Sequence, residues 1–159
     1  MDNNDYQIRM ANMNDIADVY KHMLALYESQ RVHYESSKTP DPSRLREIAE
    51  ARIRSKTNVV FLLERSDSIL GIIVGQISKF DSRFPTYSDV VGIVSEIYLV
   101  QEVRGGDFAE LLYDKLEEWF RAGGVNSVIA DFFVGNVHSR RFFGRIGFSP
   151  LSERVYKEL

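Results

Sequence analysis

The chain contains no cysteine, which excludes disulfide bonds, thiolate catalysis and metal sites with cysteine ligands. Long apolar runs are also missing, since no stretch approaches the roughly 18 consecutive apolar residues that a membrane-spanning helix needs. The hydrophilic start, residues 1–5, is unlike a signal peptide. A soluble cytoplasmic protein is therefore expected.

Charge of one sign is not in excess either. Lys and Arg number 20 and Asp and Glu number 23, which gives a formal net charge of −3, and the basic residues are scattered. This distribution argues against a nucleic acid or a membrane as a partner. The three histidines, His22, His33 and His138, lack the spacing of zinc ligands, so no metal site is expected. Each histidine is expected to be exposed or partly buried.

The length and the hydrophobic content indicate one domain. The chain has 159 residues, 44% of them hydrophobic, which is enough for a single full core. No repeat, linker or low-complexity tract divides the sequence. Residues 1–159 are therefore expected to form one domain.

Hydrophobic periodicity and turn residues predict strands and helices in a mixed order. They are a strand at 6–11, a helix at 16–27 after cap-type residues at 12–15, a helix at 43–53 capped by Ser43, strands at 59–63 and 69–77 joined by a hairpin at 65–68, a strand at 90–100, a helix at 107–122, a strand at 125–133, a helix at 138–145 and a closing strand at 155–159. Helices separate some neighbouring strands but not others. The fold is therefore expected to be α/β with a mixed sheet.

Gly105 and Gly106 lie between the strand at 90–100 and the helix at 107–122. At the start of a helix the backbone N–H groups lack partners and the helix dipole is positive, so an anion is favoured there. Glycine allows that anion to approach the backbone. Many strand-to-helix turns also carry glycine only for positive φ and bind nothing. Both interpretations stay open on this segment alone.

Two stretches resemble the GCN5-related N-acetyltransferase (GNAT) family. Residues 95–109, SEIYLVQEVRGGDFA, are similar to its central strand and acetyl-CoA motif, Q/R-x-x-G-x-G/A. Residues 136–148, NVHSRRFFGRIGF, resemble its N-x-x-A/S-x-x-F/L-Y-x-K/R-x-G-F. The second match, at its distance from the first, is more specific than either alone, and the order of elements agrees over the whole chain.

The resemblance implies a fold, an activity and a site. The fold is a mixed, mostly antiparallel central sheet with helices on both faces. The activity is transfer of acetyl from acetyl-CoA to a primary amine of a small molecule or peptide, without a metal, and dimers are common in the family. Backbone groups at a splay in the sheet would pair with the pantetheine arm, and the glycine loop would hold the pyrophosphate. The implied cofactor-binding residues are Ile97, Leu99, Arg104, Gly105, Gly106, Asp107, Phe108, Ala109, Asn136 and Phe143.

Asp107 departs from the family motif, which has glycine at this position. A carboxylate about 5 Å from a phosphate charge would oppose binding by roughly 3 kcal/mol at an effective dielectric near 20. Asp107 and Glu110 also form a capping-box pattern, whose side chains would take the N–H groups that a pyrophosphate needs. Alternatively, the Asp107 side chain turns outward and leaves those groups to the cofactor, which is the favoured hypothesis.

Phe143 is the second departure, because many family members carry there a tyrosine proposed to protonate the leaving thiolate. Glu96 and Tyr98 are the candidate substitutes, since residues two apart on a strand share a face. Glu96 could accept the proton of the amine directly or through water, and Tyr98 could donate one to the thiolate. Alternatively, Glu96 pairs with an arginine and Tyr98 packs in the core.

Tyr27 and Tyr34 lie in a segment that resembles the acceptor-binding wall of the family. Aromatic rings there would suit a cationic amine through cation–π contact, although such residues are also ordinary in loops. The two departures leave a second function open. It is a catalytically weak domain of the same fold that binds an acyl-CoA or a protein partner without efficient transfer.

Overall fold

The computed structural model describes residues 5–33, 41–79, 89–155 and 157. Its strands and helices are β1 (Tyr6–Met10), α1 (Ile16–Gln30), α2 (Pro42–Arg54), β2 (Asn58–Arg65), β3 (Ser68–Lys79), β4 (Val90–Leu99), α3 (Phe108–Ala122), β5 (Val128–Ala130) and α4 (Val137–Arg145). Short 3-10 turns lie at Met13–Asp15, Arg31–His33 and Gln101–Val103.

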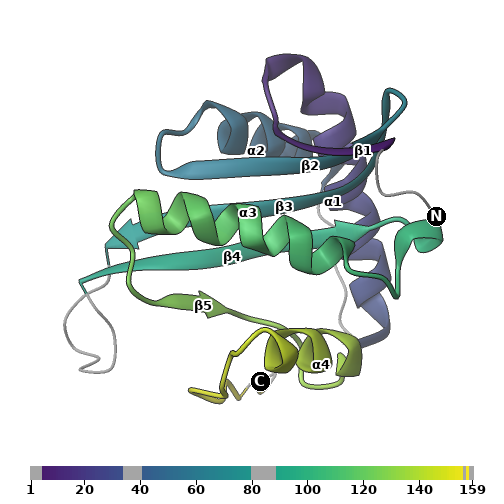
Figure 1. The fold of residues 1–159 in the computed structure, drawn as a ribbon. Coiled ribbons are helices and arrows are strands. Elements are labelled where there is room, and N and C mark those ends of the chain that lie inside the picture. Colours follow the sequence, from purple (N-terminus) through teal and green to yellow (C-terminus); the bar gives the residue numbers. More distant parts are fainter. Residues whose placement is uncertain (1–4, 34–40, 80–88, 156, 158–159) are drawn as a thin grey trace.

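The five described strands form one sheet in the order β1-β2-β3-β4-β5. Pairing is antiparallel from β1 to β4 and parallel between β4 and β5. Helix α3 covers one face, and α1 and α2 cover the other (Figure 1). The mixed, mostly antiparallel sheet with helices on both faces is thus confirmed for the described residues.

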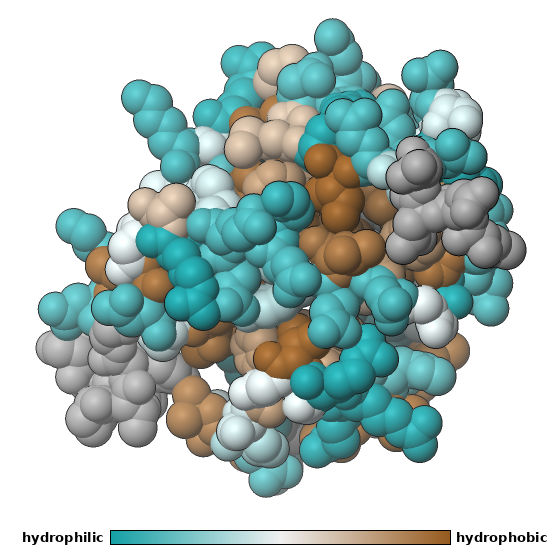
Figure 2. All heavy atoms as spheres, viewed as in Figure 1, coloured by the Kyte–Doolittle hydropathy of each residue, from teal (hydrophilic) through white to brown (hydrophobic). Residues whose placement is uncertain are grey.

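Alternation along β2 divides the core into two layers, because successive side chains of a strand point to opposite faces. Val59, Phe61 and Leu63 join the cluster that includes Leu116 and Phe120 of α3. The intervening residues join the cluster that includes α1 and α2. Figure 2 shows the molecular surface on the side of α3, where polar side chains cover most of the area and small patches of apolar side chains lie between them. Helix α3 therefore buries one stripe of its surface and leaves the opposite stripe in water.

The hairpin between β2 and β3 follows the prediction. Ser66 and Asp67 have φ angles of 48° and 64°, and Arg65 pairs with Ser68 across them. Two left-handed residues match the right-handed twist of the flanking strands, and a two-residue turn of this kind fixes the strand register. The register then keeps one face of β2 and β3 toward each core layer.

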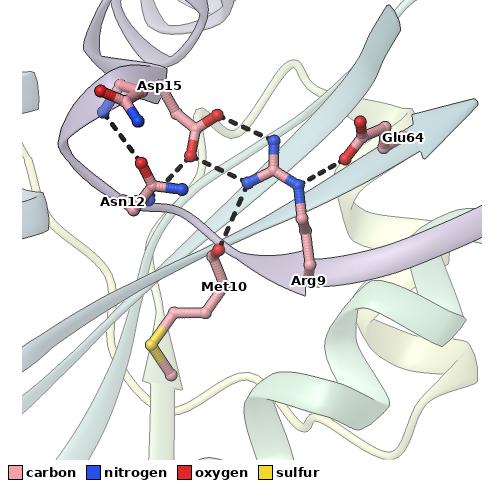
Figure 3. Close-up of polar contacts among 6 residues, drawn as sticks. Arg9, Met10, Asn12, Asp15 and Glu64 are labelled. Atoms are coloured by element: carbon pink, nitrogen blue, oxygen red, sulfur yellow. Dashed lines mark hydrogen bonds and ion pairs between the residues drawn. The ribbon is translucent and has the colours of Figure 1, made fainter. Parts of the chain in front are cut away.

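The predicted cap residues form a capping box at the 3-10 turn Met13–Asp15, which leads directly into α1 (Figure 3). Asn12 Oδ1 accepts from the Asn14 N–H at 2.9 Å, and Asp15 Oδ2 accepts from the Asn12 N–H at 2.7 Å. The guanidinium of Arg9 on β1 then contacts both oxygens of Asp15 at 2.8 Å and also pairs with Glu64 of β2. This ion-pair cluster joins the edge of the sheet to the first helix.

Two sequence predictions are wrong, one on the cap of α2 and one on a strand at the end of the chain. Helix α2 is capped by Asp41, whose Oδ1 accepts from the Ser43 N–H at 2.9 Å, and Ser43 is not the cap. Pro42 can occupy the first helical position because that position needs no N–H. No strand forms at 151–155 or at residue 157, and Tyr156 and residues 158–159 lie outside the described residues.

Candidate active site

The sheet opens between β4 and β5. Their pairing ends at Val94 and Ala130, whereas β4 continues against β3 as far as Leu99, which pairs with Gly71. Within the described residues, the last part of β4 therefore has a strand on only one side. The splay that the resemblance implied is present.

Backbone groups of Ile97 and Leu99 face this open side. The N–H of Val100 donates to Leu70 of β3 at 2.9 Å, so the Leu99 carbonyl in the same planar peptide points away from β3. Ile97, two residues earlier, has the same orientation. The open edge can therefore pair with an extended ligand as an added strand would.

Arg104 turns back onto this strand end. Its Nε donates to the Leu99 carbonyl at 2.7 Å, and its Nη1 lies 3.2 Å from Gln101 Oε1. Its Cζ also lies 5.2 Å from the centroid of the Tyr98 ring. The charge of Arg104 thus lies between the glycine loop and the open edge of β4.

The glycine loop presents bare backbone. Gly105 has a φ of +81°, and a Cβ at Gly105 or Gly106 would meet nothing within 4 Å. The first hydrogen bond of α3 runs from the Leu111 N–H to the Asp107 carbonyl. The N–H groups of residues 105–110 donate to no acceptor in the described parts of the chain. These groups, at the positive end of the helix, suit an anion.

The capping box, the less favoured of the two alternatives at the start of α3, does not form. The exposed Asp107 side chain forms no cap hydrogen bond. The Glu110 carboxylate lies 3.5 Å from Arg145 Nε on α4 instead of reaching back to the loop. The local pattern allowed the box, but Glu110 contacts α4 instead. The favoured hypothesis, an exposed Asp107 that leaves the backbone N–H groups free of its side chain, is the one found. Phe108 and Ala109 follow as half-buried core contacts, with the Phe108 ring 4.4 Å from that of Tyr6.

Asn136 and Phe143 have structural contacts that sequence reasoning did not assign. Asn136 caps α4, since its Oδ1 accepts from the Ser139 N–H at 3.0 Å. Phe143 is buried, with its ring stacked 5.6 Å from that of Phe132 and packed edge-on against Phe148. The amide nitrogen of Asn136 remains a donor, whereas Phe143 offers only apolar surface.

A β-bulge turns Glu96 toward α1 and α2. Glu96 pairs with Val74 of β3, and Val94 pairs with the adjacent Gly75, so Ser95 is an extra residue in β4. Val94 belongs to the core layer under α3. Without the extra residue Glu96 would share that face, but the bulge places it on the opposite one.

The Glu96 carboxylate is buried and paired with one cation. Its Oε1 lies 3.3 Å from Arg52 Nη2 of α2, and the side chains are 5% and 21% exposed. Its Oε2 is buried without a hydrogen-bond partner among the described residues. Burial raises the pKa of the Glu96 carboxyl, while the charge and hydrogen bond of Arg52 and the Tyr27 side chain lower it. The arginine pairing was one of the two sequence interpretations, but no sequence pattern identified Arg52.

Tyr98 shares this face with Glu96 and is half-buried against the cluster of α1 and α2. The His22 ring packs edge-on against it, with centroids 5.8 Å apart. His22 Nδ1 lies 2.8 Å from the Asp18 carbonyl, so this nitrogen carries the proton. The expectation of an exposed or partly buried His22 is wrong, because it lies on the buried face of α1 beside Val19 and is 3% exposed. Tyr27 is half-buried in the same cluster, and Tyr34 lies outside the described residues.

The sequence pattern of the acetyltransferase (GNAT) family matches residues 22–148. The chain belongs to this family. A search among curated proteins gives no match. Within the described residues of this GNAT chain, no group of three histidine or acidic side chains is placed to hold a metal ion, and no helix has the length and apolarity to cross a membrane.

Solved structures share the GNAT fold of the chain. They include the aminoglycoside N-acetyltransferase AAC(6')-Iy in complex with CoA, with a TM-score of 0.80 and 14% identity over 97% of this chain and 94% of that chain. A tetramutant of the BH1408 protein from Bacillus halodurans has a TM-score of 0.79 and 18% identity, with 96% and 99% covered. A predicted acetyltransferase with acetyl-CoA from Clostridium acetobutylicum has a TM-score of 0.77 and 15% identity, with 96% of each chain covered.

Proposed function

We propose that the chain transfers an acetyl group from acetyl-CoA directly to a primary amine of a small molecule or peptide. One observation carries the proposal. The open edge of β4 at Ile97 and Leu99 has the bare glycine loop at its end and the buried Glu96 carboxylate beside it. Family membership supports the same reaction class.

The residues of the loop and the open edge fit the donor. The N–H groups from Gly105 to Ala109, which have no acceptor among the described residues, would hold the pyrophosphate, and Arg104 would add positive charge. The backbone of Ile97 and Leu99 would pair with the pantetheine arm. The amide nitrogen of Asn136 and the aromatic surface at Phe143 would lie alongside. When bound, acetyl-CoA supplies the activated acyl thioester.

Two side chains on β4 would handle protons. Glu96, with its pKa raised by burial, would take the proton of the acceptor ammonium directly or through water. Tyr98 would donate its hydroxyl proton to the departing sulfur, a task that Phe143 has no hydroxyl to perform. Holding the amine beside the thioester would supply most of the rate enhancement.

The acceptor is proposed to be a cationic amine. The half-buried Tyr27 ring, near Glu96, suits an ammonium group through cation–π attraction, and Tyr34 is proposed from the sequence alone. A solved neighbour acetylates aminoglycosides, which supports a small polyamine-like acceptor. One domain over residues 1–159, a homodimer and a cytoplasmic location stay predictions.

Two observations favour a second candidate function. The Leu99 carbonyl on the open edge already accepts from Arg104, and the Asp107 carboxylate lies at the glycine loop. A donor must share or displace that hydrogen bond and bind beside that negative charge. Both features favour a weakly catalytic domain that binds an acyl-CoA or a protein partner without efficient transfer.

The test is a calorimetric titration with acetyl-CoA, followed by an assay of thiol release with a panel of amines. The panel contains an aminoglycoside, a linear polyamine and a peptide with a free N-terminus. Binding together with thiol release is the expected result. No binding at millimolar acetyl-CoA would contradict the proposed acetyl transfer. Binding without thiol release for any amine of the panel would support the second candidate function.

A further inference from the structure

Arg52 reaches from the last turn of α2 to three neighbouring strands. Its Nη1 lies 3.0 Å from Asn58 Oδ1 of β2 and 3.3 Å from Gln76 Oε1 of β3. Its Nη2 lies 3.3 Å from Glu96 Oε1 of β4. Two amide oxygens therefore hold one side of the guanidinium while the other side contacts the carboxylate. Arginine suits this geometry because its donors are fixed in a planar fork.

The ion pair between Arg52 and Glu96 is poorly explained as a stabilising device. Removing two charges from water costs free energy that their attraction seldom repays, and apolar replacements of buried pairs are often neutral or stabilising. Both partners also keep one buried atom without a hydrogen bond among the described residues, Arg52 Nε and Glu96 Oε2. A pair selected for stability alone would satisfy these atoms.

We propose that Arg52 is a positioning residue for Glu96, which it fixes by Oε1 so that Oε2 is the oxygen that accepts the proton of the acceptor amine. This inference rests on the proposed acetyl transfer. The guanidinium thereby sets both the orientation and the proton affinity of the carboxylate from a helix that is separate from the glycine loop.

Few charged or titratable groups face Glu96, so the effect of Arg52 can be isolated. Arg52 faces it from α2 and Tyr27 from α1. Tyr98 lies on its own strand, with His22 of α1 beyond that ring. On β3, its pairing partner Val74 and Gln76, which contacts the same guanidinium, do not titrate. Because Arg52 lowers the Glu96 pKa against the effect of burial, its removal must raise that pKa further.

The experiment compares Arg52→Gln and Arg52→Lys with the matched control Arg54→Gln. Arg54 lies on the same helix, is 65% exposed and pairs only within that helix, with Glu50 at 2.8 Å, among the described contacts. The Glu96 carboxyl is titrated by ¹³C NMR, with its signal assigned by loss in Glu96→Gln. The acid limb of kcat/KM for thiol release is measured in parallel.

In Arg52→Gln, the pKa of the Glu96 carboxyl and the midpoint of the acid limb are both expected to rise by about one pH unit. This is the lower end of the effect of an adjacent opposite charge. Arg52→Lys should move both by a smaller, measurable amount, because one ammonium cannot serve the amides and the carboxylate together. Arg54→Gln should move neither. The inference is overturned if the Glu96 carboxyl has the same pKa in Arg52→Gln as in Arg54→Gln. If Arg52→Gln does not fold, an unchanged Glu96 pKa in Arg52→Lys overturns it.

The two readouts separate this inference from the proposed function. A wild-type protein that acetylates no amine contradicts acetyl transfer, but its Glu96 carboxyl can still be titrated by NMR. If the Glu96 pKa moves in Arg52→Gln but the acid limb of kcat/KM does not, Glu96 does not control the rate. That result contradicts the catalytic part of the role assigned to Arg52.

Discussion

Arg104 Nε donates to the carbonyl of Leu99, five residues earlier, at 2.7 Å. This carbonyl lies on the open edge of β4, where a pantetheine arm would pair, and Arg104 begins the loop that would hold the pyrophosphate. The Arg104 side chain therefore contacts the proposed pantetheine edge and lies beside the proposed pyrophosphate loop. If Arg104 exchanged the Leu99 carbonyl for a phosphate oxygen when the donor binds, it would free that carbonyl for the pantetheine arm.

Arg104→Gln is expected to weaken acetyl-CoA binding by roughly ten- to a hundredfold, because a hydrogen bond to a charged partner contributes about 1.5–3 kcal/mol. Calorimetry at low salt measures the change. Arg121→Gln, at the far end of α3, removes the same charge and should leave affinity unchanged. Tighter binding by Arg104→Gln would instead show that the bond to Leu99 keeps the donor out.

Asp107→Asn is expected to tighten acetyl-CoA binding several-fold at low salt. The substitution removes a carboxylate near the proposed pyrophosphate and keeps the backbone, and its effect should shrink in high salt because water and ions screen an exposed charge. Asp114→Asn, about two turns along α3 and also exposed, is the control. Equal affinities of the two variants would show that the Asp107 charge does not act on the donor.

Asp15→Asn is expected to destabilise the fold by about 2 kcal/mol at neutral pH, because the variant breaks the charged hydrogen bonds to Arg9. Arg9 holds the pKa of the Asp15 carboxyl below its usual range. The ion pair therefore stabilises the protein above the unfolded-state pKa, near 4, and its contribution is lost as the pH falls through the lower folded-state pKa. Urea unfolding at several pH values measures this.

The difference between wild type and Asp15→Asn should thus disappear in acid. Glu118→Gln, which removes an exposed partner of Lys115, should cost little at any pH. A deficit of Asp15→Asn that persists unchanged at low pH would contradict the assignment to the ion pair.

Phe143→Tyr restores the family residue but should not restore a proton donor. Phe143 is 5% exposed between aromatic rings, so a hydroxyl there is expected to cost about 1–3 kcal/mol if it finds no partner. Thermal unfolding and thiol release are the measurements. A rise in kcat without loss of stability would show that position 143 does reach the reacting sulfur, contrary to this account.

Periodicity predicts much of the fold because it follows directly from burial. The helices at 107–122 and 138–145 and the hairpin at 65–68 come from apolar spacing and turn residues, which are local signals. The glycine loop followed from the pattern of strand, glycines and helix, and the resemblance indicated the splay. Where local and tertiary interactions compete, a local pattern does not decide the outcome. Asp107 and Glu110 match a capping-box pattern, but Glu110 contacts Arg145 in the fold.

The surroundings of Glu96 were not predictable from the sequence. The bulge at Ser95 arises from how β4 pairs with β3, and it decides which helices Glu96 faces. Arg52 lies 44 residues from Glu96, and an arginine in a polar helix face carries no sign of a buried partner. Such contacts depend on how α2 packs on the sheet, which the sequence does not encode locally.

The most direct test of the account is the pH dependence of thiol release by wild type and Glu96→Gln at saturating acetyl-CoA with an accepted amine. If Glu96 takes the proton, the variant should be at least about a hundredfold slower at neutral pH. It should then recover toward wild type as the pH approaches the pKa of the amine, since a neutral amine needs no base. A deficit of the same size at every pH would contradict this role of Glu96.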